Sequence, residues 1–253
     1  MNIGVILAGG VGSRLGAKNK NGENIPKQFV EVLGKPVLAY TVEAFQNHLL
    51  IDAIEVVCVP SYIEYMKEMK EKYGLSKIKW VAPGGSTFQE SVMNGVNYLE
   101  EKVSGDDTLI IHFGASPFVT DDIITDCLRV TKEHGTAIST TDFLLLSGKK
   151  NKLTSVSDSE NYSDIYIDRN TVAVMNSPHG FQYKYVSDLY KEAVSTGIID
   201  TVEPHTTTLM YTMGRRLYFS KGSQINIKIT RKEDLDLFEG YILMRQKKNR
   251  RNE

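Results

Sequence analysis

The glycine-rich segment after the first apolar run is the sequence feature that most limits the fold and function of this chain. Residues 3–7 are apolar and rich in β-branched side chains, which is typical of a buried strand. Leu7 and Ala8 lead into glycines at positions 9, 10, 12 and 16, and Arg14 lies among them. Glycine lets backbone N–H groups approach an anion closely, and arginine adds a charged fork for phosphate oxygens. Glycines alone are equally compatible with a tight turn that binds no ligand, and their spacing matches neither a dinucleotide fingerprint nor a P-loop.

Strand-like and helix-like patterns alternate along the rest of the chain. This alternation predicts an α/β fold, a Rossmann-like and mostly parallel sheet with helices on both faces, within a single domain that spans residues 1–253. Strands are expected at residues 3–7, 54–59, 78–81, 108–112, 136–140, 217–220 and 226–229. Helices are expected at residues 36–45, 61–73, 86–102, 182–194 and 233–245, and from residue 120 onward.

The alternation breaks between about residues 143 and 175. Residues 144–152 and 155–163 are loop-like and contain many polar side chains, and residues 164–167 alternate between polar and apolar side chains. A short alternating piece between polar loops is typical of a hairpin. The break therefore predicts a β-arm that protrudes from the sheet.

Composition and charge exclude several classes of protein. Thirty basic and 31 acidic residues nearly cancel, so the overall field gives no reason to expect nucleic acid as a partner. Two cysteines, Cys58 and Cys127, are too few for a disulfide framework, and both lie in apolar stretches. No run approaches the ~18 apolar residues of a membrane span, and the N-terminus lacks the pattern of a signal peptide. We therefore expect a cytoplasmic enzyme with no membrane contact.

A second motif supports phosphate binding. Lys27 follows Pro26 shortly after the glycines, where its ammonium could reach back to a phosphate. Together with the glycine segment, Pro26-Lys27-Gln28-Phe29 resembles the cytidylyltransferases that act on polyol phosphates, either 2-C-methyl-D-erythritol 4-phosphate or ribitol 5-phosphate. The resemblance covers nearly the whole chain. It includes the motifs at residues 33–38, 83–95, 112–120, 177–181 and 226–235.

The resemblance implies a reaction and a set of site residues. A phosphate oxygen of the acceptor would attack the α-phosphorus of CTP, and pyrophosphate would leave. Arg14, Lys27 and Lys228 would neutralise charge on the phosphates. The nucleotide would be held by Leu7, Ala8, Gly9, Gly10, Gly12, Pro83, Gly84, Gly85 and Ser91. Arg169 and Thr230 would bind the acceptor, with Arg169 on the arm of a partner subunit, so that a homodimer is expected.

Departures from the family pattern concern the metal and the acceptor. Phe113 stands where the family has an aspartate, and Ser116 and Phe88 stand where it has arginines. Because carboxylates of the family are replaced, we expect no metal ligand from the protein and a Mg²⁺ ion held by the phosphates of CTP. Asp121, Asp122 and Asp142 are expected to cap helices or face solvent. Phe113 could instead pack against the acceptor or close the site.

Three functions stay open at this point. The Leu-Ala-Gly-Gly opening resembles the ribitol-phosphate enzymes of teichoic acid or capsule synthesis more than the isoprenoid enzymes, which usually open with Ala-Ala-Gly. Phe113 and Ser116 favour an alternative of another class, a catalytically impaired relative that binds a nucleotide or acts as a partner or regulatory subunit. A transferase for a different base or sugar is the third possibility.

Overall fold

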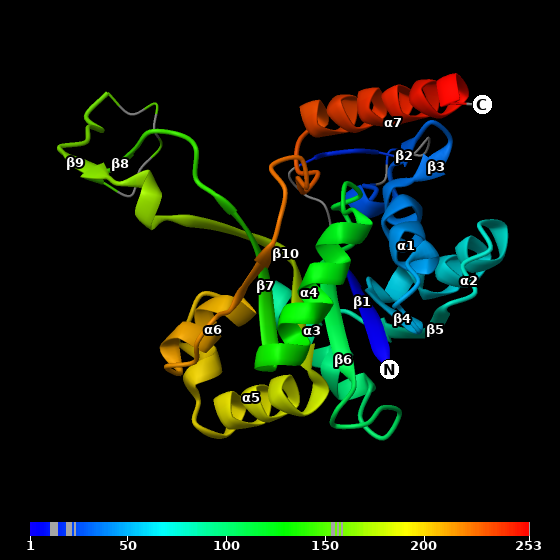
Figure 1. The fold of residues 1–253 in the computed structure, drawn as a ribbon, viewed down its shortest axis with the longest axis horizontal. Helices are drawn as coiled ribbons and strands as arrows, with labels where there is room; N and C mark the ends of the chain where they lie inside the picture. Colours follow the sequence, from blue (N-terminus) through cyan, green and yellow to red (C-terminus); the bar gives the residue numbers. More distant parts are fainter. Residues whose placement is uncertain are drawn as a thin grey trace.

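The computed structural model describes residues 1–10, 15–18, 22, 24–152, 155, 157 and 159–252 (Figure 1). A seven-stranded sheet lies at its centre, in the order β11-β7-β10-β6-β1-β4-β5. Neighbouring strands run parallel, except that β10 is antiparallel to both β6 and β7. The strands are β1 Asn2–Ala8, β4 Ala53–Cys58, β5 Ile78–Pro83, β6 Thr108–Phe113, β7 Thr136–Asp142, β10 Ala173–Gln182 and β11 Phe219–Lys221. The prediction of a mostly parallel sheet is confirmed.

Strand β1 is buried on both faces of this sheet. Ile3, Val5 and Leu7 pack into one hydrophobic cluster, and Ile6 and Ala8 pack into another. Successive side chains of a strand point to opposite faces, so the two clusters lie on the two sides of the sheet. A strand with apolar residues on both faces is typical of a parallel sheet covered by helices.

Helices cover both faces, as the sequence predicted. α1 Val37–Asn47, α2 Ile63–Lys72 and α4 Asp121–His134 pack on the face of Ile6. α3 Phe88–Tyr98, α5 Tyr183–Ser195 and α6 Thr206–Thr212 pack on the face of Leu7. Short 3-10 turns occur at η1 Lys27–Phe29, η2 Pro60–Tyr62, η3 Arg169–Thr171 and η4 Ile198–Asp200, and a small ladder joins β2 Glu31–Val32 to β3 Lys35–Pro36. None of the described helices is long and apolar enough to cross a membrane.

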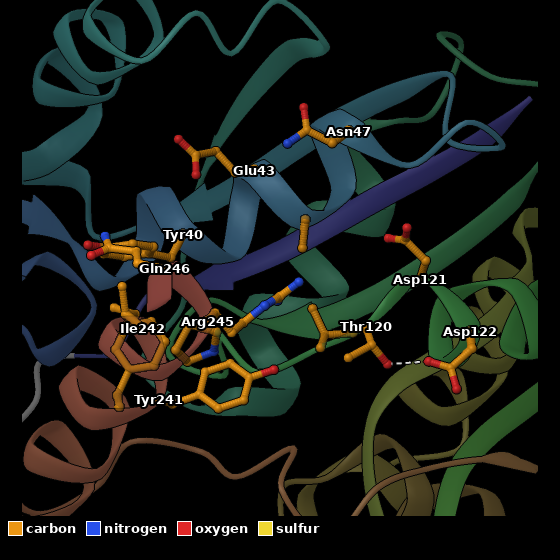
Figure 2. A pocket seen from close by; sticks show the side chains of 14 residues that line it. Tyr40, Glu43, Asn47, Thr120, Asp121, Asp122, Tyr241, Ile242, Arg245 and Gln246 are labelled. Carbon is orange, nitrogen blue, oxygen red and sulfur yellow. Dashed lines mark hydrogen bonds between the residues drawn. The ribbon is translucent and has the colours of Figure 1, made fainter. Parts of the chain in front are cut away.

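The C-terminal helix α7, Lys232–Asn252, forms a third cluster with the segments around α1. Phe238 is buried there against Phe118 and Ile229. Between α7, α1 and the start of α4 lies a pocket of about 670 Å³, which Figure 2 shows with Arg245 and Tyr241 lining it. Among the described residues that line this pocket, none was predicted as a site residue.

The predicted arm is a hairpin. β8 Ser147–Lys149 pairs antiparallel with β9 Ile165–Ile167, and the arm projects away from the body of the molecule (Figure 1). β7 leads into the arm and β10 returns from it, and these two strands pair between Asp142 and Ala173 at its base. The arm therefore grows directly out of the central sheet.

One expected strand is wrong, and strand β10 and helix α6 are the largest of the elements that were not predicted. Residues 226–229 form no strand, because the Asn226 amide bonds to the Ser177 carbonyl at 2.7 Å and holds the segment as an irregular loop. Strand β10 was missed because Asn176, Ser177 and Pro178 interrupt its alternation and its register. Helix α6 was missed because it is short and begins with three threonines, which are poor helix formers.

Candidate active site

The glycines at the ends of β1 and β5 pack directly on each other. A Cβ atom built on Gly84 would lie 2.9 Å from the Gly9 Cα, and one built on Gly9 would lie 2.9 Å from the Ser91 Oγ. The Gly84 amide donates a hydrogen bond to the Cys58 carbonyl at 2.8 Å, which ties the turn to β4. Glycine is therefore required sterically at this contact, independently of any ligand.

Ser91 connects this contact to helix α3. Its hydroxyl accepts a hydrogen bond from the Gly85 amide at 3.0 Å and donates one to the Thr87 carbonyl at 2.9 Å. The Thr87 side chain caps the helix by accepting from the Glu90 amide. Pro83, the last residue of β5, lies exposed beside this cap. Pro83, Gly84, Gly85 and Ser91, which were predicted to bind the nucleotide, thus form one connected unit.

Gln28 fixes the start of the glycine segment, and its role was not anticipated. Its side-chain amide donates to the Ala8 carbonyl at 2.6 Å and to the Gly10 carbonyl at 2.8 Å, and the residue is buried. The Leu7 carbonyl accepts from the Gly114 amide at 2.8 Å. The sequence signal that could have indicated the two Gln28 bonds is the position of this polar side chain between Lys27 and the apolar Phe29.

Lys27 and Lys228 come together although they are far apart in the sequence. The Lys27 ammonium donates to the Ile229 carbonyl at 2.6 Å, directly beside Lys228. The Ile229 amide in turn donates to the Ala115 carbonyl at 2.8 Å, just after strand β6. Both lysines are half-buried, at the end of the sheet where β1 and β6 finish.

Phe113 lies beneath Lys228. The Lys228 ammonium is 3.8 Å from the centroid of the Phe113 ring, and the ring also contacts Phe88 and His179. The aromatic residue that stands where the family has an aspartate therefore contacts one of the predicted catalytic lysines. Phe113 offers no oxygen ligand to a metal, and the described residues contain no group of three His, Cys, Asp or Glu side chains that could hold one.

Two histidines, His112 and His179, have pKa values that are lowered by burial and, in addition, by the nearby charge of Lys228. His112 Nε2 donates to the Ser116 carbonyl at 2.9 Å, and burial lowers the pKa of His112 to about 4. Burial also lowers the pKa of His179 to about 4, with further lowering by His112 and His205. Both imidazoles are therefore neutral at neutral pH and add no charge near Lys228.

The predicted acceptor residues Thr230 and Arg169 lie in different parts of the fold. Thr230 holds the start of α7, because its amide donates to the Asp234 carboxylate at 2.7 Å and its hydroxyl donates to the Lys228 carbonyl at 3.0 Å. Arg169 is exposed on the arm, where its guanidinium donates to the Leu144 carbonyl at 2.9 Å. Gly12 and Arg14 lie outside the described residues.

The acidic residues Asp121, Asp122 and Asp142 have different surroundings. The Asp122 carboxylate pairs with Lys221 and accepts a hydrogen bond from Thr120 Oγ1, and these two contacts hold the pKa of Asp122 below its usual value. Asp121 and Asp122 occupy the first turn of α4, where carboxylates interact favourably with the helix dipole. Asp142 is exposed at the end of β7.

The fold and the site together indicate a class of protein. A Rossmann-like sheet whose carboxyl edge carries closely packed glycines, a threonine-capped helix and two lysines is typical of α/β enzymes that bind nucleotides.

Comparison with known proteins gives the family. The family model described as IspD, 2-C-methyl-D-erythritol 4-phosphate cytidylyltransferase, matches residues 3–245. The chain is 36% identical to a ribitol-5-phosphate cytidylyltransferase of Lacticaseibacillus paracasei, over 96% of this chain and 98% of the relative. It is 35% identical to a 2-C-methyl-D-erythritol 4-phosphate cytidylyltransferase of Clostridium acetobutylicum, over 93% of this chain and 94% of that protein. The chain belongs to this cytidylyltransferase family and is a nucleotidyltransferase.

Solved structures agree on the fold. The crystal structure of 4-diphosphocytidyl-2C-methyl-D-erythritol synthase from Anaerococcus prevotii has a TM-score of 0.76 and 21% identity, and the match covers 96% of each chain. At this identity the likeness concerns the fold alone.

Proposed function

We propose that this enzyme transfers CMP from CTP to a polyol phosphate and releases pyrophosphate. The observation that carries the proposal is the hydrogen bond from the Lys27 ammonium to the Ile229 carbonyl, which joins Lys27 to the segment of Lys228. Gln28, the neighbour of Lys27, bonds to the Gly10 carbonyl, so this contact lies beside the glycine segment. This arrangement gathers positive charge where the strands end, at the edge where open α/β sheets bind their ligands. Arg14, which belongs to the glycine segment, is the third cation of the proposal.

Catalysis would depend on position and charge. A phosphate oxygen of the acceptor attacks the α-phosphorus, the bond to the β-phosphate oxygen breaks, and pyrophosphate leaves with the bonding electrons. The cations neutralise charge on the phosphates during this step, and the protein supplies no nucleophile. Because Lys27 and Lys228 are half-buried, their charges are less screened than those of exposed lysines.

The nucleotide base and ribose are assigned to the unit of residues 83–91. Backbone groups of Leu7, Ala8, Gly9, Gly10 and Gly12 would line the triphosphate. Mg²⁺ is expected to be held by the phosphates and water, since Phe113 has no oxygen ligand to offer, and its charge would help neutralise the triphosphate.

The acceptor in this proposal is ribitol 5-phosphate rather than 2-C-methyl-D-erythritol 4-phosphate. Two relatives named ribitol-5-phosphate cytidylyltransferase match at 36% identity. The Leu-Ala-Gly-Gly opening resembles that branch of the family. Thr230 and Arg169 are the proposed acceptor residues. The proposed setting is the cytoplasm, within the synthesis of teichoic acid, capsule or a related surface polymer.

Arg169 would act from the arm of a second subunit. The arm carries large apolar side chains that are mostly exposed in one chain, which supports its burial in a homodimer. They are Leu144, Leu145, Leu146, Tyr162, Ile165 and Tyr166. Arg169 lies on the same arm, which projects away from the body of the molecule (Figure 1).

A pyrophosphate-release assay tests the proposal. The enzyme with CTP and Mg²⁺ should release pyrophosphate with ribitol 5-phosphate, and more slowly with 2-C-methyl-D-erythritol 4-phosphate. Calorimetric titration with CTP, with and without Mg²⁺, runs beside it. CTP binding without pyrophosphate release for any polyol phosphate would favour the catalytically impaired alternative.

A further inference from the structure

The Lys228 ammonium contacts the aromatic ring of Phe113 at the end of β6. A distance of 3.8 Å between the ammonium and the ring centroid lies well within the range of about 6 Å for a cation–π interaction. Both residues are half-buried, so water screens this attraction only in part.

The Phe113 ring is held in a fixed orientation. Its backbone pairs with Leu7 at the last rung between β6 and β1. Phe88 meets the ring edge-to-face at 5.3 Å between centroids, and His179 does so at 6.2 Å. Two neighbouring rings and the sheet therefore determine where the face of Phe113 lies.

The backbone of Lys228 is anchored on both sides. Asn226 bonds through its amide to the Ser177 carbonyl at 2.7 Å, and the Ile229 amide bonds to the Ala115 carbonyl at 2.8 Å. These bonds fix the start of the lysine side chain, and the contact with Phe113 fixes its end. A long side chain that would otherwise sample many rotamers is thereby held in one place.

We propose that Phe113 is a positioning residue, which holds the Lys228 ammonium for the phosphates of the nucleotide without neutralising its charge. A carboxylate in its place would also attract the ammonium, but would cancel much of the charge that a phosphate needs. A phenyl ring attracts the ammonium through its quadrupole and carries no net charge. This inference rests on the proposed function, since it presumes that Lys228 contacts the nucleotide.

The first test is a double-mutant cycle on CTP affinity, measured by calorimetry. Phe113→Leu removes the ring and keeps an apolar side chain, and Phe113→Tyr keeps the ring. We expect Phe113→Leu to weaken CTP binding by about three- to tenfold and Phe113→Tyr to change it less than about twofold. In a Lys228→Ala background, Phe113→Leu should have no further effect, because the ammonium that it positions is gone.

The second test reads the contact itself and needs no nucleotide. Lysines of the whole protein are dimethylated with ¹³C-formaldehyde, which keeps their charge, and the Lys228 methyl signal is assigned with Lys228→Arg. A ring above or below the methyl groups shifts their proton signal upfield. We expect that shift in the wild type and in Phe113→Tyr, and its loss in Phe113→Leu.

The outcomes distinguish a failure of the positioning role from a failure of the proposed function. If the wild type binds CTP and the Phe113→Leu variant binds it equally tightly, the positioning role is overturned. A Lys228 signal without an upfield shift would overturn the contact. A wild type that does not bind CTP would instead overturn the proposed function, and the positioning role with it, whatever the methyl signal shows.

Discussion

The ammonium of Lys27 bonds to the backbone carbonyl of Ile229 at 2.6 Å, across 202 positions of the sequence. The bond attaches the turn that follows the glycine segment to the loop that carries Lys228. An ammonium has three N–H donors, so this bond is compatible with a contact to phosphate. Lys27 therefore has both a structural role and a proposed electrostatic one.

Replacing Lys27 should weaken CTP binding. Lys27→Ala removes a charge-assisted contact worth on the order of 1.5–3 kcal/mol, or roughly 10- to 150-fold in affinity. Calorimetry with CTP measures this loss. Lys70 is a matched control, because its ammonium also bonds to a backbone carbonyl, that of Ile78 at 2.8 Å, in another part of the fold. Lys70→Ala should leave CTP affinity unchanged; an unchanged affinity in Lys27→Ala would contradict the assignment.

The packing of Gly84 on Gly9 should not tolerate a methyl group. Gly84→Ala places Cβ 2.9 Å from backbone, so the turn must shift and both thermal stability and CTP affinity should fall. Gly240 in α7 is the control, since a Cβ there meets nothing within 4 Å. Gly240→Ala should raise stability by roughly 0.5–1 kcal/mol. Equal melting temperatures for Gly84→Ala and the wild type would show that the contact is looser than described.

Much of the fold could be predicted because it is encoded locally. The apolar run of β1 and the glycines after it can be recognised from neighbouring residues alone. The same holds for the alternation of strands and helices and for the loop-like arm that interrupts it. The direction of β10 could not be predicted in this way. It follows from the arm, which returns the chain beside β7, and its residues Asn176 to Pro178 show no alternation.

The candidate site was predicted less completely than the fold, for a similar reason. Lys27 and Lys228 were expected to serve the same phosphates, but the bond that joins their segments is long-range and carries no local signal. Gln28 lay inside a recognised motif, yet its two bonds to the Ala8 and Gly10 carbonyls depend on how the turn closes. The contact of Phe113 with Lys228 depends on the loop that replaced the expected strand at residues 226–229.

Acid should destabilise the protein through two buried histidines. The pKa values of His112 and His179, about 4 when folded, lie below the value of about 6.5 for an unfolded chain. The unfolded chain therefore binds more protons as the pH falls, and stability is lost between about pH 6.5 and pH 4, by up to about 3 kcal/mol for each histidine. Urea unfolding of the wild type and of His179→Gln at pH 7 and pH 4.5 measures this. The variant should lose less stability on acidification; an equal loss would contradict burial as the cause.

Arg169 should act in trans. An Arg14→Ala protein and an Arg169→Ala protein, each nearly inactive alone, should partly recover activity when mixed. Hybrid dimers would contain one site with both arginines intact. Mass spectrometry of differentially labelled subunits establishes that exchange has occurred. If exchange is complete and no activity returns, the arm does not complete the site of its partner.

The transfer of CMP itself is tested most directly by ³¹P NMR of the enzyme with CTP, Mg²⁺ and ribitol 5-phosphate. The account predicts that the CTP signals decline while two products grow in equal amounts, pyrophosphate and a diphosphate diester in which CMP is joined to ribitol 5-phosphate. Lys228→Ala should slow both together. CTP that binds but stays intact with every polyol phosphate, or that is only hydrolysed to CMP, would contradict the account.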